Sequence, residues 1–495
     1  MQYSRRHHLL AGLALASMTL SGCGGDGGGS SGPVVINPGT TSGGTSGGTS
    51  GGTGTSCALA DRKAWVDAQM REWYLFPETL PASLNASAYA TVDDYIDALT
   101  ATARAQGKDR YFTYITSIRE EDAYYQSGET AGFGMRIALD GANRLWITEA
   151  YEGAPALNAG IDRGAEILAI GTTSGNMRTV SAIIAAEGTD GLNNALGPST
   201  AGTSRVFRVS YNGVTSDKTV TKADFEIPPV SSRYGSRVLT DNGEKIGYIN
   251  LRNFITPAKA PLTDAFSTMR AQGVTKFIID FRYNGGGLID VASHMGNLMG
   301  GNRSTSDIFA KIAFRPSKAA ENETYTFAPQ PQSVSPVKIA FIGTGSTASA
   351  SEMVMNGFAP FLNANAALIG TNTYGKPVGQ IALDRSACDD RLRVVSFAVE
   401  NQAGVSNYYN GLAGKMGATC YAADDISKPL GDPGEASVKA ALDYLAGRSC
   451  SASASSTLSG ASASLDRVGA PAAPRKLLQN PEPDNTAQRE MPGLY

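Results

Sequence analysis

Short apolar segments alternate with helix-forming segments along residues 235–450, and this alternation is the strongest constraint on the fold. Patterns typical of buried strands occur at residues 246–251, 276–281, 337–342 and 367–370. The first three of these strand candidates are each followed by a stretch with helical character. Strands that alternate with helices are typical of a layered α/β core. The sequence therefore predicts an α/β domain over residues 235–450.

Composition divides the rest of the chain. Residues 57–118 carry apolar side chains at helical spacing and predict a helical region. Residues 130–225 begin with two strand patterns joined by an Asp-Gly turn and predict a β-rich unit. Residues 23–56 are rich in Gly, Ser and Thr, and predict a flexible tether. Residues 451–495 turn to Ser and Ala, then to Pro and charge, and predict a disordered tail.

Residues 1–22 have the pattern of an export signal. Arg5 and Arg6 precede a short apolar stretch that ends in Leu-Ser-Gly-Cys at Cys23. This string resembles a bacterial lipobox, which implies that Cys23 is diacylated and anchors the mature chain to a membrane. Gly24, in place of an Asp retention signal, favours the periplasm-facing side of the outer membrane within the cell envelope. An ordinary cleaved signal is the alternative, and either Sec or twin-arginine export fits the basic residues.

Four cysteines remain besides Cys23, and they are Cys57, Cys388, Cys420 and Cys450. An even number of cysteines in an exported chain predicts disulfides, for which three connectivities exist. We favour Cys388–Cys420 as a local staple and Cys57–Cys450 as a link between the two ends of the folded region. The absence of a Cys-x-x-Cys motif argues against a zinc ribbon or a redox motif.

Two bulk features narrow the function. The formal net charge is −3, and no Lys/Arg cluster is interleaved with aromatic residues, so nucleic-acid binding is not expected. Histidine is scarce, because His7 and His8 lie in the export signal and only His294 remains. His294 lies in a helical pattern among apolar residues, where a histidine is more often packed than catalytic. A Ser-His-Asp triad therefore has one candidate base at most, and a two-histidine zinc site has none.

Ser349 and Lys376 suggest a different serine chemistry. Ser349 lies where a strand pattern leads into a helix pattern, within Thr-Ala-Ser-Ala-Ser-Glu. Such a junction exposes a hydroxyl at a helix N-terminus, where free amides favour a developing anion, although simple capping is the alternative. Lys376 follows beside Gly375, and a solvated surface charge is the alternative there. A neutral, desolvated lysine can accept the proton of a serine hydroxyl, so the pair predicts a nucleophile and its general base.

The strings together resemble the carboxyl-terminal processing peptidases, also called tail-specific proteases, of the S41 type. The resemblance rests on the string around Ser349, on Gly-Lys-Pro-Val-Gly-Gln at residues 375–380, and on Asp-Phe-Arg-Tyr-Asn-Gly-Gly-Gly at residues 280–287. It covers roughly residues 60–450. It implies a helical N-terminal cap, a PDZ-like domain and an α/β protease core of the crotonase/ClpP type, which together make a mixed α/β multidomain fold.

The same resemblance implies a role for five residues of the core. Ser349 would be the nucleophile and Lys376 the general base, oriented by Gln380. The amides of Gly286 and Ala350 would hold the oxyanion. Neither a metal nor an organic cofactor is implied.

The order of strands and turns in residues 130–225 resembles a PDZ domain, with a small β-rich spacer as the alternative. PDZ domains bind a chain terminus by adding it as a strand, with loop amides holding its carboxylate. By resemblance, this loop consists of Gly132, Phe133, Gly134 and Met135.

The sequence therefore predicts an exported, lipid-anchored serine endopeptidase that acts on protein or peptide substrates with free C-termini. Two alternatives stay open. One is a catalytically silent, PDZ-containing scaffold of the same fold, and the other is a hydrolase that acts on a non-peptide ester.

Overall fold

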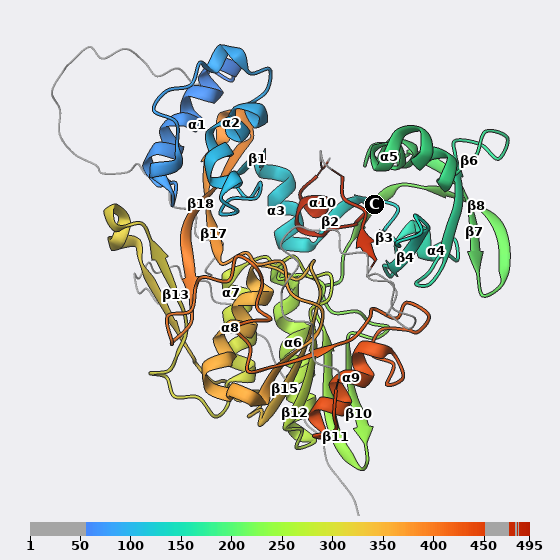
Figure 1. Ribbon diagram of the computed structural model, residues 1–495, viewed down its shortest axis with the longest axis vertical. Coiled ribbons are helices and arrows are strands. Elements are labelled where there is room, and N and C mark those ends of the chain that lie inside the picture. Colours follow the sequence, from blue (N-terminus) through green and yellow to red (C-terminus); the bar gives the residue numbers. More distant parts are fainter. Residues whose placement is uncertain (1–55, 451–474, 481–482, 484) are drawn as a thin grey trace, which may run out of the picture. The chain divides into compact units, whose positions relative to one another are not determined.

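The computed structural model describes residues 56–450, 475–480, 483 and 485–495 (Figure 1). The expected export signal, the lipid-anchor candidate Cys23 and the tether up to residue 55 lie outside the described residues, as do residues 451–474 of the predicted tail. Among the helices of the described residues, none combines the length and the apolar character needed to cross a bilayer.

A six-stranded sheet forms the centre of the α/β part, in the order β10-β11-β12-β15-β16-β19. Its strands are β10 (Ser236–Asp241), β11 (Glu244–Asn250), β12 (Lys276–Asp280), β15 (Lys338–Gly343), β16 (Ala366–Gly370) and β19 (Ala418–Tyr421). The β10–β11 pair is antiparallel, and the remaining neighbours run parallel. The predicted α/β alternation is thus confirmed, with strand ends shifted by one or two residues.

Helices cover both faces of this sheet (Figure 1). They are α6 (Lys259–Ala271), α7 (Ile289–Met299), α8 (Ala350–Leu362) and α9 (Ala436–Leu445). Because successive side chains of a strand face opposite sides, each strand contributes to two cores. Phe277 and Ile279 pack in the core of α6, α7 and α8, whereas Ile278 packs in the core of α9. Burial on both faces explains why these strands are continuously apolar.

A five-stranded sheet with β18 at its centre adjoins the N-terminal helices. Its strands are β1 (Tyr114–Ser117), β13 (Ile308–Phe314), β14 (Glu323–Thr326), β17 (Val378–Arg385) and β18 (Asp390–Glu400). The helices α1 (Leu59–Trp73) and α2 (Val92–Ala105) lie in the segment that was expected to be helical. The end of that segment instead forms β1, because residues 114–117 pair with β18.

The β-rich part follows helix α3 (Ile118–Ser127). Its main sheet has the order β20-β3-β4-β5-β7-β8, with β6 beside β5. These strands are β3 (Met135–Leu139), β4 (Leu145–Ala150), β5 (Glu166–Gly171), β6 (Arg178–Thr179), β7 (Ser204–Tyr211), β8 (Val214–Thr221) and β20 (Lys476–Leu477). A separate pair is formed by β2 (Glu129–Gly132) and β9 (Ala223–Glu226). The helices of this part are α4 (Pro155–Asn158) and α5 (Val180–Leu196).

The prediction of a disordered tail is wrong for the part of it that the structure describes. Strand β20 pairs with β3, and residues 486–490 form helix α10 (Thr486–Glu490). Met491 and Leu494 are buried in an apolar cluster. Strand pairing uses main-chain groups and needs no particular side-chain pattern. The Pro-rich and charged composition of this segment therefore concealed its order.

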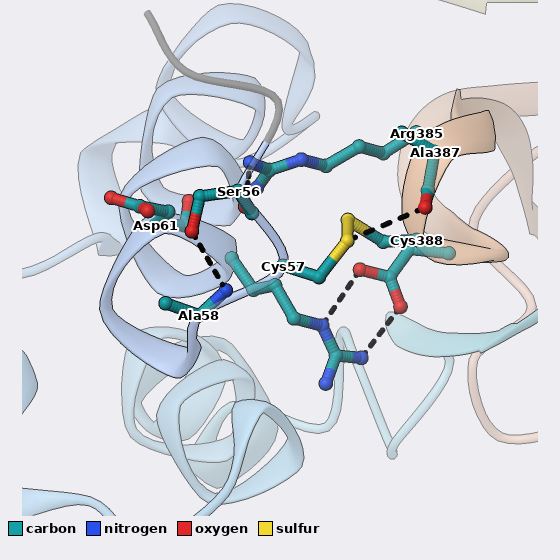
Figure 2. The surroundings of a disulfide bond; sticks show 9 residues. Ser56, Cys57, Ala58, Asp61, Arg385, Ala387 and Cys388 are labelled. Carbon is teal, nitrogen blue, oxygen red and sulfur yellow. Dashed lines mark hydrogen bonds and ion pairs between the residues drawn. A yellow bond between two sulfur atoms is a disulfide. The ribbon is translucent and has the colours of Figure 1, made fainter.

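Both favoured disulfide pairings, Cys388–Cys420 and Cys57–Cys450, are wrong. The structure pairs Cys57 with Cys388, and Cys420 with Cys450, at Cα–Cα distances of 5.5 and 5.6 Å. Cys388 lies in the turn between β17 and β18, against the start of α1, whereas Cys420 lies in β19 of the other sheet. Closeness in sequence therefore did not bring these two cysteines together. Figure 2 shows the Cys57–Cys388 bond beside Arg385, whose guanidinium donates to the main-chain oxygens of Ser56 and Asp61.

Candidate active site

Ser349 occupies a strained junction between a strand and a helix. It is the last residue before α8, with φ 54° and ψ −117°. A non-glycine residue in this region of backbone space typically costs about 1–3 kcal/mol and persists only where the surroundings enforce it. The turn that precedes it is held by Thr347, whose hydroxyl donates to the carbonyl of Phe281 over 2.8 Å. The surrounding contacts thus hold the partly exposed Ser349 at the N-terminal end of α8 in spite of the strain.

Glu352 connects this junction to the loop that carries Lys376. Its buried carboxylate accepts from the N–H groups of Ser349 (3.1 Å), Gly375 (2.8 Å) and Lys376 (2.7 Å), and from the Thr373 hydroxyl (2.6 Å). Burial raises the pKa of the Glu352 carboxyl, and these four donors oppose that rise. Glu352 is a functional residue beyond those predicted from sequence, although a Glu three residues after a helix-capping Ser is a recognisable signal.

Lys376 is oriented by a chain of hydrogen bonds. Its Nζ donates to Gln380 Oε1 over 2.9 Å, and Gln380 Nε2 donates to the carbonyl of Phe112 over 2.6 Å. The same ammonium lies 4.8 Å from the centre of the Phe112 ring. Burial lowers the pKa of Lys376, while the carboxylates of Glu490 and Asp109 act in the opposite direction. The net lowering increases the neutral fraction, which is the form that accepts a proton.

The two residues of the predicted dyad are linked through Glu352. Within the described residues, no hydrogen bond joins Ser349 Oγ to Lys376 Nζ. Their backbones are instead held together, because both amides donate to Glu352. Catalytic hydrogen bonds are often long or absent in resting enzymes and form only with substrate bound.

Gly286 and Ala350, the two predicted oxyanion donors, lie next to Ser349. A Cβ on Gly286 would lie 2.7 Å from Ser349 Cβ and 3.0 Å from the Ala350 nitrogen, and Gly286 has φ 118°. Only glycine fits this position without strain. The Gly286 amide donates to Asn284 Oδ1 over 2.9 Å, so it is engaged in this state. The Ala350 amide belongs to the first turn of α8, where helix geometry supplies no acceptor.

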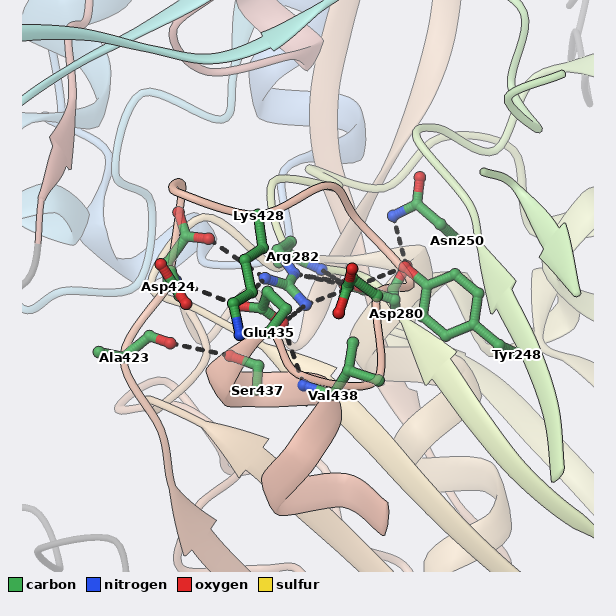
Figure 3. Close-up of polar contacts among 12 residues, drawn as sticks. Tyr248, Asn250, Asp280, Arg282, Ala423, Asp424, Lys428, Glu435, Ser437 and Val438 are labelled. Carbon is green, nitrogen blue, oxygen red and sulfur yellow. Dashed lines mark hydrogen bonds and ion pairs between the residues drawn. The ribbon is translucent and has the colours of Figure 1, made fainter. Parts of the chain in front are cut away.

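A buried ionic network anchors residues 280–287, which carry Gly286 (Figure 3). Arg282 is fully buried and pairs with Asp280 (2.9 Å), Glu435 (2.9 Å) and Asp424 (3.1 Å). Glu435 in turn caps helix α9. The network therefore fixes the segment between the six-stranded sheet and α9.

Two arginines of the β-rich part also bind this segment. Arg136 donates to the carbonyl of Tyr283 over 2.7 Å, and Arg163 donates to the Tyr283 hydroxyl over 3.0 Å. Arg163 also pairs with Asp424 at 2.8 Å. The sheet that contains β3 is thus bonded directly to the segment that carries the candidate oxyanion donor.

The four residues expected to form a ligand-binding loop lead from β2 into β3, where the edge of β3 is occupied. Met135 and Tyr495 exchange both main-chain hydrogen bonds, at 3.2 and 2.9 Å. The Ile137 amide donates to the carbonyl of Gly493 over 2.8 Å. Tyr495 packs in the same apolar cluster as Phe133. A segment of the chain itself therefore lies as an added strand beside the loop formed by Gly132, Phe133, Gly134 and Met135.

His294, the alternative base, packs between α6 and α7. Its Nε2 lies 2.9 Å from the Thr263 hydroxyl and 3.2 Å from the carbonyl of Lys259. Burial lowers the pKa of His294. Within the described residues, His294 forms hydrogen bonds with α6 and Gln330 and none with Ser349.

Comparison with known proteins shows two family matches within the chain. The family described as Peptidase family S41 matches residues 245–408, and the Peptidase S41 N-terminal domain matches residues 61–114. The first match contains Ser349 and Lys376 together with the segment 280–287.

Similar curated proteins carry the same description. A carboxyl-terminal-processing protease of Picosynechococcus sp. is 27% identical over 252 residues, which cover 50% of this chain and 55% of that protein. The carboxy-terminal processing protease CtpA of Bacillus subtilis is 26% identical over 278 residues, which cover 55% of this chain and 53% of that protein. The chain thus spans about half the length of the curated relatives that it matches.

Among solved structures, a putative S41 protease from Bacteroides fragilis has a TM-score of 0.61 at 22% sequence identity. The match covers 77% of this chain and 97% of that chain, and it shows a common fold. Residues 61–114 and 245–408 are therefore similar in sequence to two domains of S41 peptidases, and the fold is shared with the putative S41 protease from Bacteroides fragilis.

Proposed function

We propose that this chain is an exported serine endopeptidase that cleaves protein substrates, with Ser349 as nucleophile and Lys376 as general base. The observation that carries the proposal is the shared carboxylate of Glu352, which binds the amides of both residues. It holds a strained serine at a helix N-terminus beside the loop of a lysine whose pKa burial lowers. This combination is suited to nucleophilic catalysis without histidine.

In the proposed reaction, Ser349 Oγ attacks a peptide carbonyl while its proton passes to the neutral amine of Lys376. The oxyanion accepts hydrogen bonds from the amides of Ala350 and Gly286, after the Gly286 amide has left Asn284. Lys376 then returns the proton to the leaving amine, and the carbonyl remains bound to Ser349 as an ester. Water, deprotonated by Lys376, attacks this ester, and the proton passes from Lys376 to Ser349 Oγ as the acid product leaves. One oxyanion donor typically contributes about 100–1,000-fold in rate.

The proposed role of Gln380 is to hold the amine of Lys376 until substrate enters. Its side-chain amide spans from the carbonyl of Phe112 to the lysine Nζ. For catalysis, the Lys376 side chain turns from Gln380 toward Ser349. The similarity to carboxyl-terminal-processing proteases supports protein tails as the substrate class. The edge of β3 supports the capture of such tails as an added strand by the PDZ-like part.

The dyad is tested with purified wild type and the variants Ser349→Ala and Lys376→Ala, on an unfolded protein and with a fluorophosphonate probe. We expect both variants to lose cleavage, and Ser349→Ala to lose labelling. The exposed Ser87, which is replaced by Ala as a matched control, is expected to change neither. Turnover retained by both active-site variants would rule out the dyad.

Membrane attachment is a separate part of the proposal and rests on the lipobox-like string that ends in Cys23. We propose a lipid anchor at Cys23 that holds the protein on the periplasmic side of the outer membrane. Metabolic labelling with a palmitate analogue should mark the full chain but not Cys23→Ala. Equal labelling of both forms, or none of the wild type, would refute the anchor.

A binding or scaffold role is the second candidate. It is favoured by the engaged Gly286 amide and by the missing hydrogen bond between Ser349 and Lys376. The fluorophosphonate experiment separates the two functions, because a scaffold gives no Ser349-dependent label even when a peptide ligand is added. A comparison of peptide and ester substrates tests the non-peptide hydrolase alternative.

A further inference from the structure

Residues 485–495 lie against the candidate active site at one end. The Tyr114 hydroxyl donates to Glu490 Oε1 over 3.0 Å. The backbone at Glu490 presses on the segment that carries Gly286, since a Cβ on Gly285 would lie 2.3 Å from the carbonyl oxygen of Glu490. The carboxylate of Glu490 also acts to raise the pKa of Lys376, and so favours the form that cannot accept a proton.

At its other end, the same segment fills the edge of β3. Gly493, Leu494 and Tyr495 lie antiparallel to residues 135–137, with three main-chain hydrogen bonds of 2.8–3.2 Å. Arg136 of β3 binds both this C-terminal segment and the segment that carries Gly286. Its guanidinium donates to the carbonyls of Pro492 and Tyr283, over 3.1 and 2.7 Å.

The Tyr495 side chain fills a specific pocket. It is 3% exposed and packs in the apolar cluster that contains Phe133, Phe207 and Leu192. Its hydroxyl donates to the side-chain oxygen of Asn193 on α5. Apolar surroundings with a polar acceptor at the ring hydroxyl suit an aromatic side chain, and a tyrosine above all.

We propose that residues 485–495 are a built-in ligand of the β3 edge, and that substrates whose tails carry an aromatic residue in place of Tyr495 bind by displacing them. The substrate part of this inference rests on the proposed function. The built-in ligand and a substrate therefore compete for the β3 edge, and displacement also takes the Glu490 carbonyl away from Gly285, next to the candidate oxyanion donor Gly286.

The binding test uses the full chain with Ser349→Ala, which needs no catalysis. The probe is a fluorescent peptide with the sequence of residues 486–495. Gly493→Ala weakens the built-in ligand without removing a side chain, because Gly493 has φ 81° and its Cβ would lie 2.9 Å from the Ile137 carbonyl. Gly107→Ala is the matched control, since Gly107 has φ 70° and open space around it.

We expect Gly493→Ala to bind the probe at least about tenfold more tightly than the parent, and Gly107→Ala to match the parent. A probe with Ala in place of the last Tyr should bind about tenfold or more weakly, because it leaves the aromatic pocket empty. Equal binding by parent and Gly493→Ala, or equal binding of both probes, would overturn the inference. Thermal unfolding of every variant confirms that the comparison is made between folded proteins.

A chain that lacks residues 485–495 provides a second variant, and its expected probe binding matches or exceeds that of Gly493→Ala. With Ser349 intact, Gly493→Ala should also cleave an unfolded protein faster than wild type. If no form cleaves, the proposed function fails, and the peptide measurements still decide this inference. If every form cleaves equally and the probe binds equally, the inference fails and the function stands.

Discussion

The amides of Ser349 and Lys376 donate to the same atom, Oε2 of Glu352, over 3.1 and 2.7 Å. The nucleophile candidate and the base candidate are 27 residues apart in sequence and come from different elements, yet one carboxylate fixes both main chains. The relative position of the two residues therefore depends on a group that takes no part in the proposed proton transfer. Glu352 is a positioning residue.

Replacement of Glu352 by Gln should impair both stability and activity. The substitution replaces one carboxylate oxygen, which accepts hydrogen bonds, by an NH2 group, which cannot accept them. At least one buried N–H or O–H donor therefore loses its partner, at about 1–3 kcal/mol each. We expect a lower midpoint of thermal unfolding and about 10–100-fold slower labelling of Ser349 by a fluorophosphonate. Glu120→Gln, an exposed acid on α3, is the control. An unchanged labelling rate and midpoint in Glu352→Gln would contradict the positioning role.

Lys376 should show opposite effects on stability and on activity. Its pKa is lowered in the folded state, so between that lowered value and the ordinary value of 10.5 the unfolded chain binds one more proton than the folded chain. Stability then rises with pH across this window, and below the window the folded state carries a constant penalty. Lys376→Met should remove this dependence and raise the unfolding midpoint at neutral pH while abolishing activity. Lys245→Met, at an exposed position, should leave both unchanged.

The same lowered pKa sets the pH dependence of the proposed reaction. Because the neutral amine is the reactive form, the cleavage rate should rise with pH and level off at a pH below 10.5. Initial rates measured between pH 5 and 10 in buffers of constant ionic strength give this profile. A rate that still increases in proportion to hydroxide at the upper end would argue against Lys376 as the base.

The buried network around Arg282 predicts a large loss of stability on its removal. Arg282→Met leaves the carboxylates of Asp280 and Glu435 without their cation, and breaking a buried ion pair typically costs about 3–5 kcal/mol. Chemical denaturation should show this loss, whereas Arg270→Met, at an exposed position on α6, should cost less than about 0.5 kcal/mol. A loss of similar size in both variants would show that the network contributes little.

The two disulfides should differ in their contribution. The Cys57–Cys388 bond closes a sequence separation of 331 residues, and the Cys420–Cys450 bond one of 30. In the chain-entropy model these loops correspond to about 6 and about 3.5 kcal/mol. Paired Cys→Ser variants of each bond, compared by denaturant unfolding, should therefore place the larger loss at Cys57–Cys388. The reverse order would indicate that residual structure in the unfolded chain outweighs loop length.

The α/β core could be predicted because its strands and helices leave a direct trace in the sequence. Buried parallel strands are continuously apolar, and residues 276–281 and 337–342 were located to within a residue or two from that feature alone. The nucleophile junction and the lysine loop were found as motifs, and the structure places both beside Glu352. Their catalytic roles stay predictions until the variants are measured.

The parts that escaped prediction depend on contacts between distant segments. Closeness in sequence favours a Cys388–Cys420 bond, but Cys388 lies in the turn between β17 and β18, and Cys420 lies in β19 of the other sheet. The order of residues 485–495 depends on main-chain pairing with β3, which any sequence without a proline at the bonded positions can make. Neither segment of such a contact has a sequence pattern that identifies its partner. The contact therefore cannot be predicted from either segment alone.

The Cys57–Cys388 bond has a mechanical consequence. It joins the chain just ahead of α1 to the turn between β17 and β18, and strand β17 begins two residues after Lys376. A force that pulls on the chain ahead of Cys57 is transmitted through the disulfide bond to the β17–β18 hairpin. Helix α1, which begins at Leu59, therefore carries little of this force. Such a force would therefore reach the strand beside Lys376 before it could unwind α1.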